Sequence, residues 1–312
     1  MSKIAFVFPG QGSQYVGMGK DLYERFPEAR EVYDTADQLL GFAISKVCFE
    51  GPEDHLRQTA NTQPALFVTS MACLRPLEKE GILPDIVGGH SIGEYAALVA
   101  AGAISFEPAL TLVRKRGEVM QEAGVAQPGT MVAIIGLDAG QVQIACDRAS
   151  AKGIVEIANY NCPGQVVISG ENEAVREASR LAEEMGARRV IPLNVSGAFH
   201  SRLMASAADI LKVELARAEF RDARIPIVAN VTADYVQKAE EIRDALSRQI
   251  SGSVRWEESV RKMINYGVDT FVEVGPGKVL SGLIKRINGS VEVHSVSDAT
   301  SMEQFLKIQQ EG

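Results

Sequence analysis

Cysteine is scarce in this sequence, and its few copies stand far apart. The chain of 312 residues has four cysteines, and no Cys-x-x-Cys pair occurs. This spacing argues against a zinc site or a redox pair. Isolated reduced thiols are typical of a cytosolic protein. We therefore expect a cytoplasmic protein without a metal site.

An excess of basic residues is also missing. The 32 lysines and arginines are outnumbered by 40 acidic residues, which gives a net charge of −8 and argues against general nucleic-acid binding. The longest apolar run, around Tyr95 to Ile104, is too short to span a bilayer. Met1-Ser2-Lys3 leads into a strand-like segment without the pattern of a signal peptide. We expect no nucleic acid and no membrane among the partners.

A nucleotide-binding fingerprint is absent as well. The first predicted strand, Ile4–Phe8, runs into the glycine-rich loop Pro9–Gln14. Tyr15 stands where a Gly-x-Gly-x-x-Gly motif needs its last glycine, and no Gly-Lys-Ser/Thr follows, so the loop matches neither a dinucleotide site nor a P-loop. The loop offers close backbone approach and the side-chain amide of Gln11. The alternative is an ordinary turn between a strand and a helix.

The chain is organised around Gly89-His90-Ser91-Ile92-Gly93. An apolar run at 82–87 predicts a strand before this motif, and the helix formers at 94–101 predict a buried helix after it. A Gly-x-Ser-x-Gly motif between a strand and a helix is the context of a nucleophile elbow. Such a turn exposes the Ser91 hydroxyl and leaves the Ile92 N–H free to bind an oxyanion. The alternative is a plain turn rich in glycine and serine.

Alternating strands and helices predict an α/β fold in two units. Before the break at 124–129, helices are predicted from Pro64, with the proline in its first turn, and at 108–123. Further strands are predicted at 131–137, 154–158, 166–169, 189–193, 225–229, 270–274 and 291–296, and helices at 139–149, 171–185, 239–250 and 256–266. The loop 159–164 should join two of these strands.

The segment 126–195 has its own pattern. Its predicted order, β-α-β-β-α-β, is that of a ferredoxin-like unit. Because such a unit returns the chain near its entry point, we expect it to be an insertion. The larger domain would then comprise 1–125 and 196–312.

His200 is the best candidate for a general base. Only four histidines occur, and His200 lies in a Gly/Ser-rich loop at the joint between the two predicted units, where clefts tend to form. A serine needs such a base to become a good nucleophile. No acidic residue between Ser91 and His200 stands in a telling motif. The free backbone carbonyl of Gln249, at the end of a predicted helix, could orient the imidazole instead. The alternative is a surface histidine.

Arg116 occupies an unusual position for an arginine. On its predicted helix Leu112, Arg116 and Met120 follow at i, i+4 and i+8 and share one face, which is partly apolar. If that face meets the site, the guanidinium would grip an anionic group of the substrate with its fork of donors. The alternative is an arginine that snorkels at the edge of the core.

Together these segments resemble the malonyl-CoA:acyl carrier protein transacylases of bacterial fatty-acid synthesis, and also the acyltransferase domains of polyketide synthases. The likeness runs from end to end. The motifs that carry it are Phe8-Pro9-Gly10-Gln11-Gly12-Ser13-Gln14, Thr62-Gln63-Pro64-Ala65, Gly89-His90-Ser91-Ile92-Gly93-Glu94-Tyr95, Arg116 with Met120, Asn159-Tyr160-Asn161, Gly197-Ala198-Phe199-His200-Ser201 and Glu273-Val274-Gly275-Pro276-Gly277. The resemblance implies an α/β-hydrolase-like large domain with a ferredoxin-like small domain.

The resemblance also implies roles. Ser91 would carry the acyl group as an ester, and His200 would activate it. Gln11 and the Ile92 N–H would form the oxyanion hole, and the Gln249 carbonyl would hold the His200 ring. Arg116 would bind the malonyl carboxylate, with Met120, Phe199 and Asn161 beside the substrate. Phe199 matches the malonyl-selective form of its loop, and Ile92 replaces a common leucine where only the backbone is needed.

The partners implied by the resemblance are malonyl-CoA and an acyl carrier protein. Because carrier proteins of this family are acidic, the carrier should dock on a basic patch. Candidates for that patch are Arg188, Arg189, Lys285 and Arg286, with Lys278 nearby. We expect a monomer that needs no cofactor.

Two other functions fit parts of the pattern. A serine esterase or thioesterase shares the elbow and the base, but it predicts an acid partner for the histidine and has no need of Arg116. A non-catalytic module that binds carrier proteins would not need an intact Ser91, His200 and Gln11. Substitution of Arg116 distinguishes a malonyl transferase from an esterase, because only the transferase should lose activity.

Overall fold

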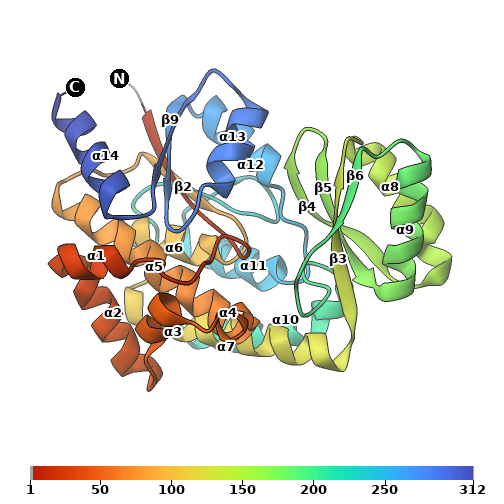
Figure 1. Ribbon diagram of the computed structural model, residues 1–312, viewed down its shortest axis with the longest axis horizontal. Coiled ribbons are helices and arrows are strands. Elements are labelled where there is room, and N and C mark those ends of the chain that lie inside the picture. The colour runs from red at the N-terminus through yellow and green to blue at the C-terminus, as the bar shows by residue number, and fades with distance from the viewer. Residues whose placement is uncertain (1–2, 312) are drawn as a thin grey trace.

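The larger part of the chain is built on a six-stranded sheet. The computed structural model describes residues 3–311, and Figure 1 shows their arrangement. The sheet order is β10-β9-β1-β2-β7-β8, parallel except for the edge strand β8. The strands are β1 (Lys3–Phe8), β2 (Ile86–Gly89), β7 (Ile227–Val228), β8 (Tyr235–Val236), β9 (Val268–Val274) and β10 (Glu292–Val296).

Both faces of this sheet are buried, as expected of a parallel sheet. Successive side chains of a strand point to opposite faces, so Phe6 and Phe8 join one core cluster while Ala5 and Val7 join another. The first cluster packs under α1 (Lys20–Arg25), α2 (Pro27–Leu40), α3 (Ile44–Glu50), α4 (Glu53–Arg57), α5 (Thr59–Lys79), α6 (Gly93–Ala100), α7 (Phe106–Ala126), α10 (Ala205–Arg217), α11 (Ala239–Gln249) and α14 (Ala299–Glu311). The second packs under α12 (Trp256–Asn265) and α13 (Val279–Ile287).

A smaller antiparallel sheet lies beside the large one (Figure 1). Its order is β4-β5-β3-β6, and it has a core of its own with the two helices that cross it. The elements are β3 (Gly129–Ile135), α8 (Ala139–Ala149), the short helix η1 (Ser150–Lys152), β4 (Val155–Cys162), β5 (Gln165–Glu171), α9 (Asn172–Glu184) and β6 (Arg189–Pro192). The α/β fold with a ferredoxin-like small unit is confirmed, while the domain boundaries at 126 and 195 stay a prediction.

Two expectations in the large unit were wrong in detail. The strand before the elbow is Ile86–Gly89 rather than 82–87, because Asp85 caps the start of β1 by accepting from the Ile4 N–H. Helix α5 begins at Thr59, so Pro64 lies inside it and not in its first turn. Proline leaves the carbonyl four residues earlier without its helical donor. Arg114 Nη1 donates to that Ala60 carbonyl at 2.8 Å, which compensates for the missing bond.

The expected loop at 159–164 was also wrong. Asn159 to Cys162 continue β4, and only Pro163 and Gly164 connect it to β5. The strand is bulged between Ile157 and Asn159, and Val254 of the large unit pairs there: its N–H donates to Ala158 O at 2.8 Å and its carbonyl accepts from Tyr160 N at 2.9 Å. This contact joins the middle of β4 to the large unit.

Candidate active site

The elbow forms where two neighbouring strands end. β1 and β2 are parallel neighbours, and their last residues, Phe8 and Gly89, are paired with each other. The loops that follow the two strands therefore meet at the carboxyl edge of the sheet, where α/β folds bind ligands. Ser91 has a φ of 53°, the strained left-handed conformation of a nucleophile elbow. A Cβ on Gly89 would lie 2.0 Å from the Gly93 carbonyl carbon, so the sharp turn requires glycine.

Asn230 holds the elbow through two hydrogen bonds from the segment after the adjacent strand β7. It lies just beyond β7 and is fully buried. Its Oδ1 accepts from the Ser91 N–H at 2.7 Å, and its Nδ2 donates to the Gly89 carbonyl at 2.6 Å. Both bonds satisfy backbone groups that the turn leaves without ladder partners. Asn230 thus holds the strained serine in place, a role that no sequence motif indicated.

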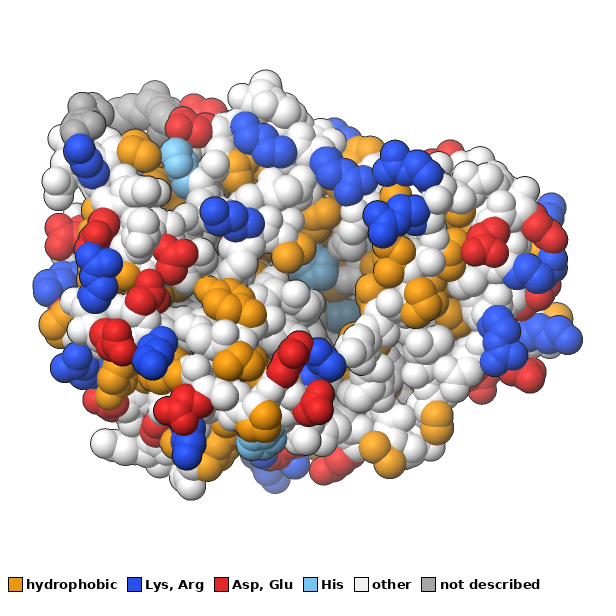
Figure 2. All heavy atoms as spheres, viewed as in Figure 1, with side chains coloured by type: hydrophobic (Ala, Val, Ile, Leu, Met, Phe, Trp, Pro, Cys, Tyr) orange, Lys and Arg blue, Asp and Glu red, His pale blue; other side chains and the backbone are white. Residues whose placement is uncertain are grey.

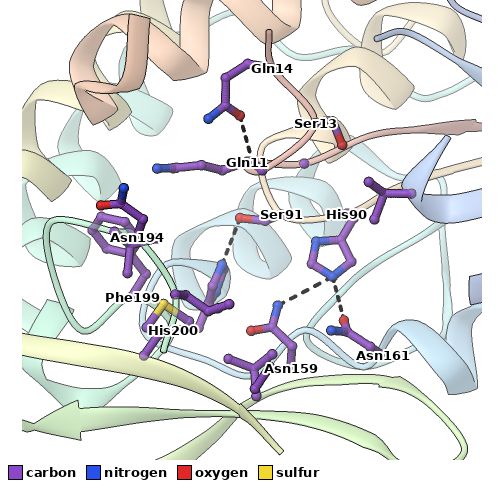
Figure 3. Close-up of a pocket in the computed structure, with 18 of the residues that line it drawn as sticks. Gln11, Ser13, Gln14, His90, Ser91, Asn159, Asn161, Asn194, Phe199 and His200 are labelled. Carbon is purple, nitrogen blue, oxygen red and sulfur yellow. Dashed lines mark hydrogen bonds between the residues drawn. The ribbon is translucent and has the colours of Figure 1, made fainter. Parts of the chain in front are cut away.

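His200 lies against Ser91. Its Nε2 is 2.8 Å from Ser91 Oγ (Figure 3). Its Nδ1 is 3.0 Å from the carbonyl oxygens of both Gln249 and Gly252. Carbonyls only accept, so Nδ1 carries the proton and Nε2 of the neutral ring is left to accept the serine hydroxyl. No acidic residue takes this place among the described residues that contact the ring, and two backbone carbonyls orient it instead.

Burial and charge keep the His200 imidazole neutral. The side chain is almost completely buried, and desolvation followed by the Arg116 charge lowers its pKa to about 3, although the two carbonyls favour the protonated ring. A neutral imidazole is the form that can remove a proton. The Ser91–His200 pair is therefore ready to act as nucleophile and base at neutral pH.

Arg116 is fully buried on α7 and points at the nucleophile. Its Nη1 donates to Gln63 Oε1 at 2.7 Å, and its Nη2 lies 3.1 Å from Ser91 Oγ and 3.0 Å from Gln249 Oε1. Its Nε has no hydrogen-bond partner among the described residues, and none of their carboxylates forms an ion pair with it. A buried guanidinium without a paired anion is costly, so the geometry suits an incoming carboxylate.

Gln249 joins the parts of the site. Besides its carbonyl bond to His200, its side-chain Nε2 donates to the Ser91 carbonyl at 2.9 Å and to Glu94 Oε2 at 2.7 Å. Sequence reasoning had assigned only its backbone. The buried Glu94 was missed as well, although it follows directly on the elbow and a charged residue in an apolar helix is itself a signal.

A cavity of about 480 Å³ opens onto Ser91 and His200. Among its lining residues are the predicted Gln11, Met120, Asn161 and Phe199, so the fold brings all of them to one place. Figure 3 shows Gln11, Asn161 and Phe199 around this cavity. The Gln11 side chain extends toward the cavity and its Nε2 lies 3.5 Å from Thr59 Oγ1. Ile92 stands at the N-terminus of α6, where an amide has no helical acceptor.

Two asparagines of β4 reach into the same cavity beside His90. Asn161 Oδ1 is 3.0 Å from His90 Nε2, and Asn159 Nδ2 is 3.4 Å from the same nitrogen (Figure 3). Burial lowers the pKa of His90, so the ring is neutral. The small sheet therefore supplies one polar wall of the cavity.

Basic residues gather at the rim of the hollow between the two sheets. Figure 2 shows lysine and arginine side chains over α13 and the neighbouring edge of the small sheet. Arg286 on α13 is exposed, and its Nη1 donates to Gln165 Oε1 at 2.6 Å. Gln165 and Val279 both line the cavity. Because Val279 is the first residue of α13, the N-terminal end of this helix lies at the mouth of the cavity. Arg188, Arg189, Lys278 and Lys285 are exposed too.

Residues 3–311 contain neither a metal-binding cluster nor a membrane-spanning helix. No group of three or more His, Cys, Asp or Glu side chains there is placed to hold a metal ion. No helix in that range is long and apolar enough to cross a membrane.

The chain is similar to known acyl transferases in both sequence and structure. The acyl transferase domain family matches residues 5–309. The malonyl CoA-acyl carrier protein transacylase of Bacillus subtilis (strain 168) is 50% identical over 308 residues, 98% of this chain and 97% of that protein. The crystal structure of MCAT from Streptococcus pneumoniae is 45% identical with a TM-score of 0.94, covering 98% and 100% of the two chains. A malonyl-transacylase in complex with a type II PKS acyl-carrier protein is 44% identical, with a TM-score of 0.96 and the same coverage. This chain therefore belongs to the acyl transferase family, among the malonyl CoA-acyl carrier protein transacylases.

Proposed function

We propose that this protein moves a malonyl group from malonyl-CoA to the phosphopantetheine thiol of an acyl carrier protein, in fatty acid biosynthesis. The single observation that carries the proposal is the buried Arg116, which points at Ser91 Oγ and has no carboxylate paired with it among the described residues. A hydrolase of neutral esters has no use for such a cation, whereas a malonyl group brings the missing anion.

The first half-reaction forms an ester on the protein. His200 Nε2 takes the Ser91 hydroxyl proton as Ser91 Oγ attacks the thioester carbonyl. The Ile92 N–H and the Gln11 side chain stabilise the oxyanion. When the intermediate collapses, the carbon–sulfur bond breaks and the leaving thiolate of CoA takes the proton from His200. Arg116 holds the distal carboxylate throughout.

The second half-reaction reverses these steps with another thiol. The phosphopantetheine thiol of the carrier enters the vacated cavity and gives its proton to His200. Its sulfur attacks the malonyl-serine carbonyl, and the Ser91 oxygen leaves with that proton. A narrow cavity that the bound arm fills keeps water from competing.

The chain's own side chains and backbone groups supply every group in this scheme. We propose that the reaction needs no cofactor and that one chain acts as a monomer in the cytoplasm, with the carrier docked on the basic rim formed by Arg188, Arg189, Lys278, Lys285 and Arg286. The acidic carrier and this rim have opposite charges, which favours docking despite the net charge of −8.

The test is a competition between transfer and hydrolysis. Purified protein is mixed with malonyl-CoA and holo acyl carrier protein, and malonyl-carrier and free malonate are quantified by mass spectrometry over time. The proposal predicts that malonyl-carrier greatly exceeds malonate and that Ser91→Ala forms neither above background. Malonate as the main product would assign the chain to thioester hydrolysis instead.

A further inference from the structure

Glu94 is a buried carboxylate that the mechanism above does not use. It lies on the first turn of α6, just beyond the elbow, with 1% of its surface exposed. Its Oε2 accepts from Gln249 Nε2 at 2.7 Å and from the Asn230 N–H at 3.2 Å. Buried carboxylates are rare unless something nearby compensates their charge. The buried cation in this network is Arg116, on the other side of the Gln249 amide.

The Gln249 amide stands between the two charges in a fixed orientation. Its Oε1 accepts from Arg116 Nη2 at 3.0 Å, and its Nε2 faces Glu94. A guanidinium only donates and a carboxylate only accepts, so each neighbour determines which end of the amide it meets. Glu94 therefore compensates Arg116 without touching it. A direct bidentate pair would have filled the guanidinium fork that the substrate carboxylate needs.

We propose that Glu94 is the remote counter-ion of Arg116 and that its negative charge sets how tightly the site holds the substrate carboxylate, and thereby the selectivity between malonyl and uncharged acyl groups. This inference rests on the proposed malonyl transfer. Glu94 touches no reacting atom and is a positioning and charge-balancing residue.

The sign of the effect follows from Coulomb's law. The ionised Glu94 partly offsets the attraction between Arg116 and an incoming carboxylate, whereas an uncharged acyl group feels neither charge. Removal of the Glu94 charge therefore strengthens malonyl binding and leaves acetyl binding nearly the same. Burial raises the pKa of Glu94 to about 7, while Gln249, the Asn230 N–H and Arg116 lower it, so the comparison is made at pH 8.5, where the carboxylate is ionised.

The central variant is Glu94→Gln, which keeps the shape and can still accept from Gln249 and Asn230. Steady-state transfer from malonyl-CoA and from acetyl-CoA is measured for this variant and for Glu94→Asp, which keeps the charge but shortens the side chain. Glu122→Gln, on the exposed part of α7, is the matched control. In Glu94→Gln we expect the malonyl/acetyl ratio of kcat/KM to rise about tenfold, mainly through a lower KM for malonyl-CoA. Glu94→Asp and Glu122→Gln should keep the wild-type ratio within about threefold.

An equal loss for both substrates in Glu94→Gln, or an unchanged ratio, would overturn the proposal, because a merely structural residue affects both alike. A second measurement needs no substrate. In an Arg116→Met background Glu94 is a buried charge without its partner, so adding Glu94→Gln should raise the melting temperature, whereas in the wild-type background it should lower it. If Glu94→Gln lowered the melting temperature in both backgrounds, the result would contradict the counter-ion role. If the wild-type protein transferred no malonyl group, the proposed function would fail while this stability cycle would still test the pairing.

Discussion

At the scale of single residues, the site depends on charges and tautomers that the surrounding groups fix. The two carbonyls on His200 Nδ1 leave only Nε2 to face Ser91. The acceptors Gln63 and Gln249 hold Arg116 without neutralising it. Each of these side chains is thus oriented by neutral partners, and the positive charge beside the serine has no paired carboxylate among the described residues.

Arg116→Ala should separate malonyl transfer from transfer of uncharged acyl groups. Loss of a buried, charge-assisted contact lowers kcat/KM for malonyl-CoA by about 100-fold or more, while acetyl-CoA keeps or gains activity because no carboxylate is needed. Arg116→Lys, which keeps the charge but not the fork, should lie between the two. Malonyl transfer that is unchanged in Arg116→Ala would remove this residue from the mechanism.

The low pKa of His200 predicts how acid affects stability. The folded-state pKa of about 3 lies below the unfolded value near 6.5. Between pH 6.5 and pH 3, His200 is protonated in the unfolded chain but neutral in the folded protein. The contribution of His200 to the free energy of unfolding is therefore complete above pH 6.5 and is lost as the pH falls toward 3. Relative to His200→Gln, the wild-type free energy of unfolding should fall by about 1 kcal/mol per pH unit below pH 6.5.

Urea unfolding of both proteins at several pH values measures that difference. The comparison isolates His200 because Glu94, whose raised pKa acts in the opposite sense, is present in both. Parallel stability curves between pH 4 and 8 would show that His200 is not kept neutral by the fold.

At the scale of secondary-structure elements, the elbow depends on how closely α6 approaches β1. A Cβ on Gly93 would lie 2.1 Å from the Phe8 carbonyl oxygen. Gly93→Ala should therefore push the first turn of α6 away from β1 and cost about 3 kcal/mol or more of stability, together with most of the activity. Thermal unfolding and the acylation rate measure both effects.

Gly282→Ala is the matched control for this substitution. Gly282 lies on the exposed side of α13, and nothing lies within 4 Å of its added Cβ. The substitution should stabilise the helix by about 0.5–1 kcal/mol and leave catalysis intact. Equal behaviour of the two variants would show that the close contact at Gly93 is not required.

The sequence predicted elements better than it predicted what holds them together. The elbow and the stripe with Arg116 follow from local patterns such as Gly-x-Ser-x-Gly and i, i+4 spacing, whereas the roles of His200 and of the Gln249 carbonyl stay predictions. Asn230 and Glu94 were missed because their roles arise from contacts more than 130 residues apart in the chain. The helix start at Thr59 was missed because the Arg114 contact compensates for Pro64, which no local rule shows.

At the scale of the whole molecule, the two units supply different parts of the candidate site. The large unit carries Ser91, His200 and Arg116 on its loops and on α7, and the small sheet supplies Asn159 and Asn161 as the facing wall of the cavity. Val254 of the large unit forms two backbone hydrogen bonds with β4, and these bonds hold that wall in place. The mouth of the cavity opens beside the exposed basic residues of α13.

Charge reversal at the rim should weaken use of the carrier without affecting the chemistry. In the variant with Lys278→Glu and Arg286→Glu, the KM for holo carrier should rise about tenfold at low ionic strength and less at high salt. Acylation by a malonyl thioester without the CoA nucleotide should keep its rate, because it has no phosphates to attract. Arg217→Glu, an exposed reversal on α10, is the control. An unchanged carrier KM in the double variant would place docking elsewhere.

The most direct test of the account is the intact mass of the protein after mixing with malonyl-CoA, and again after addition of holo acyl carrier protein. The account predicts one malonyl adduct, absent in Ser91→Ala, that water removes only slowly and that moves to the carrier when the carrier is added. An adduct that hydrolyses at once without the carrier, or no adduct at all, would contradict the acyl-serine transfer that the geometry of Ser91, His200 and Arg116 supports.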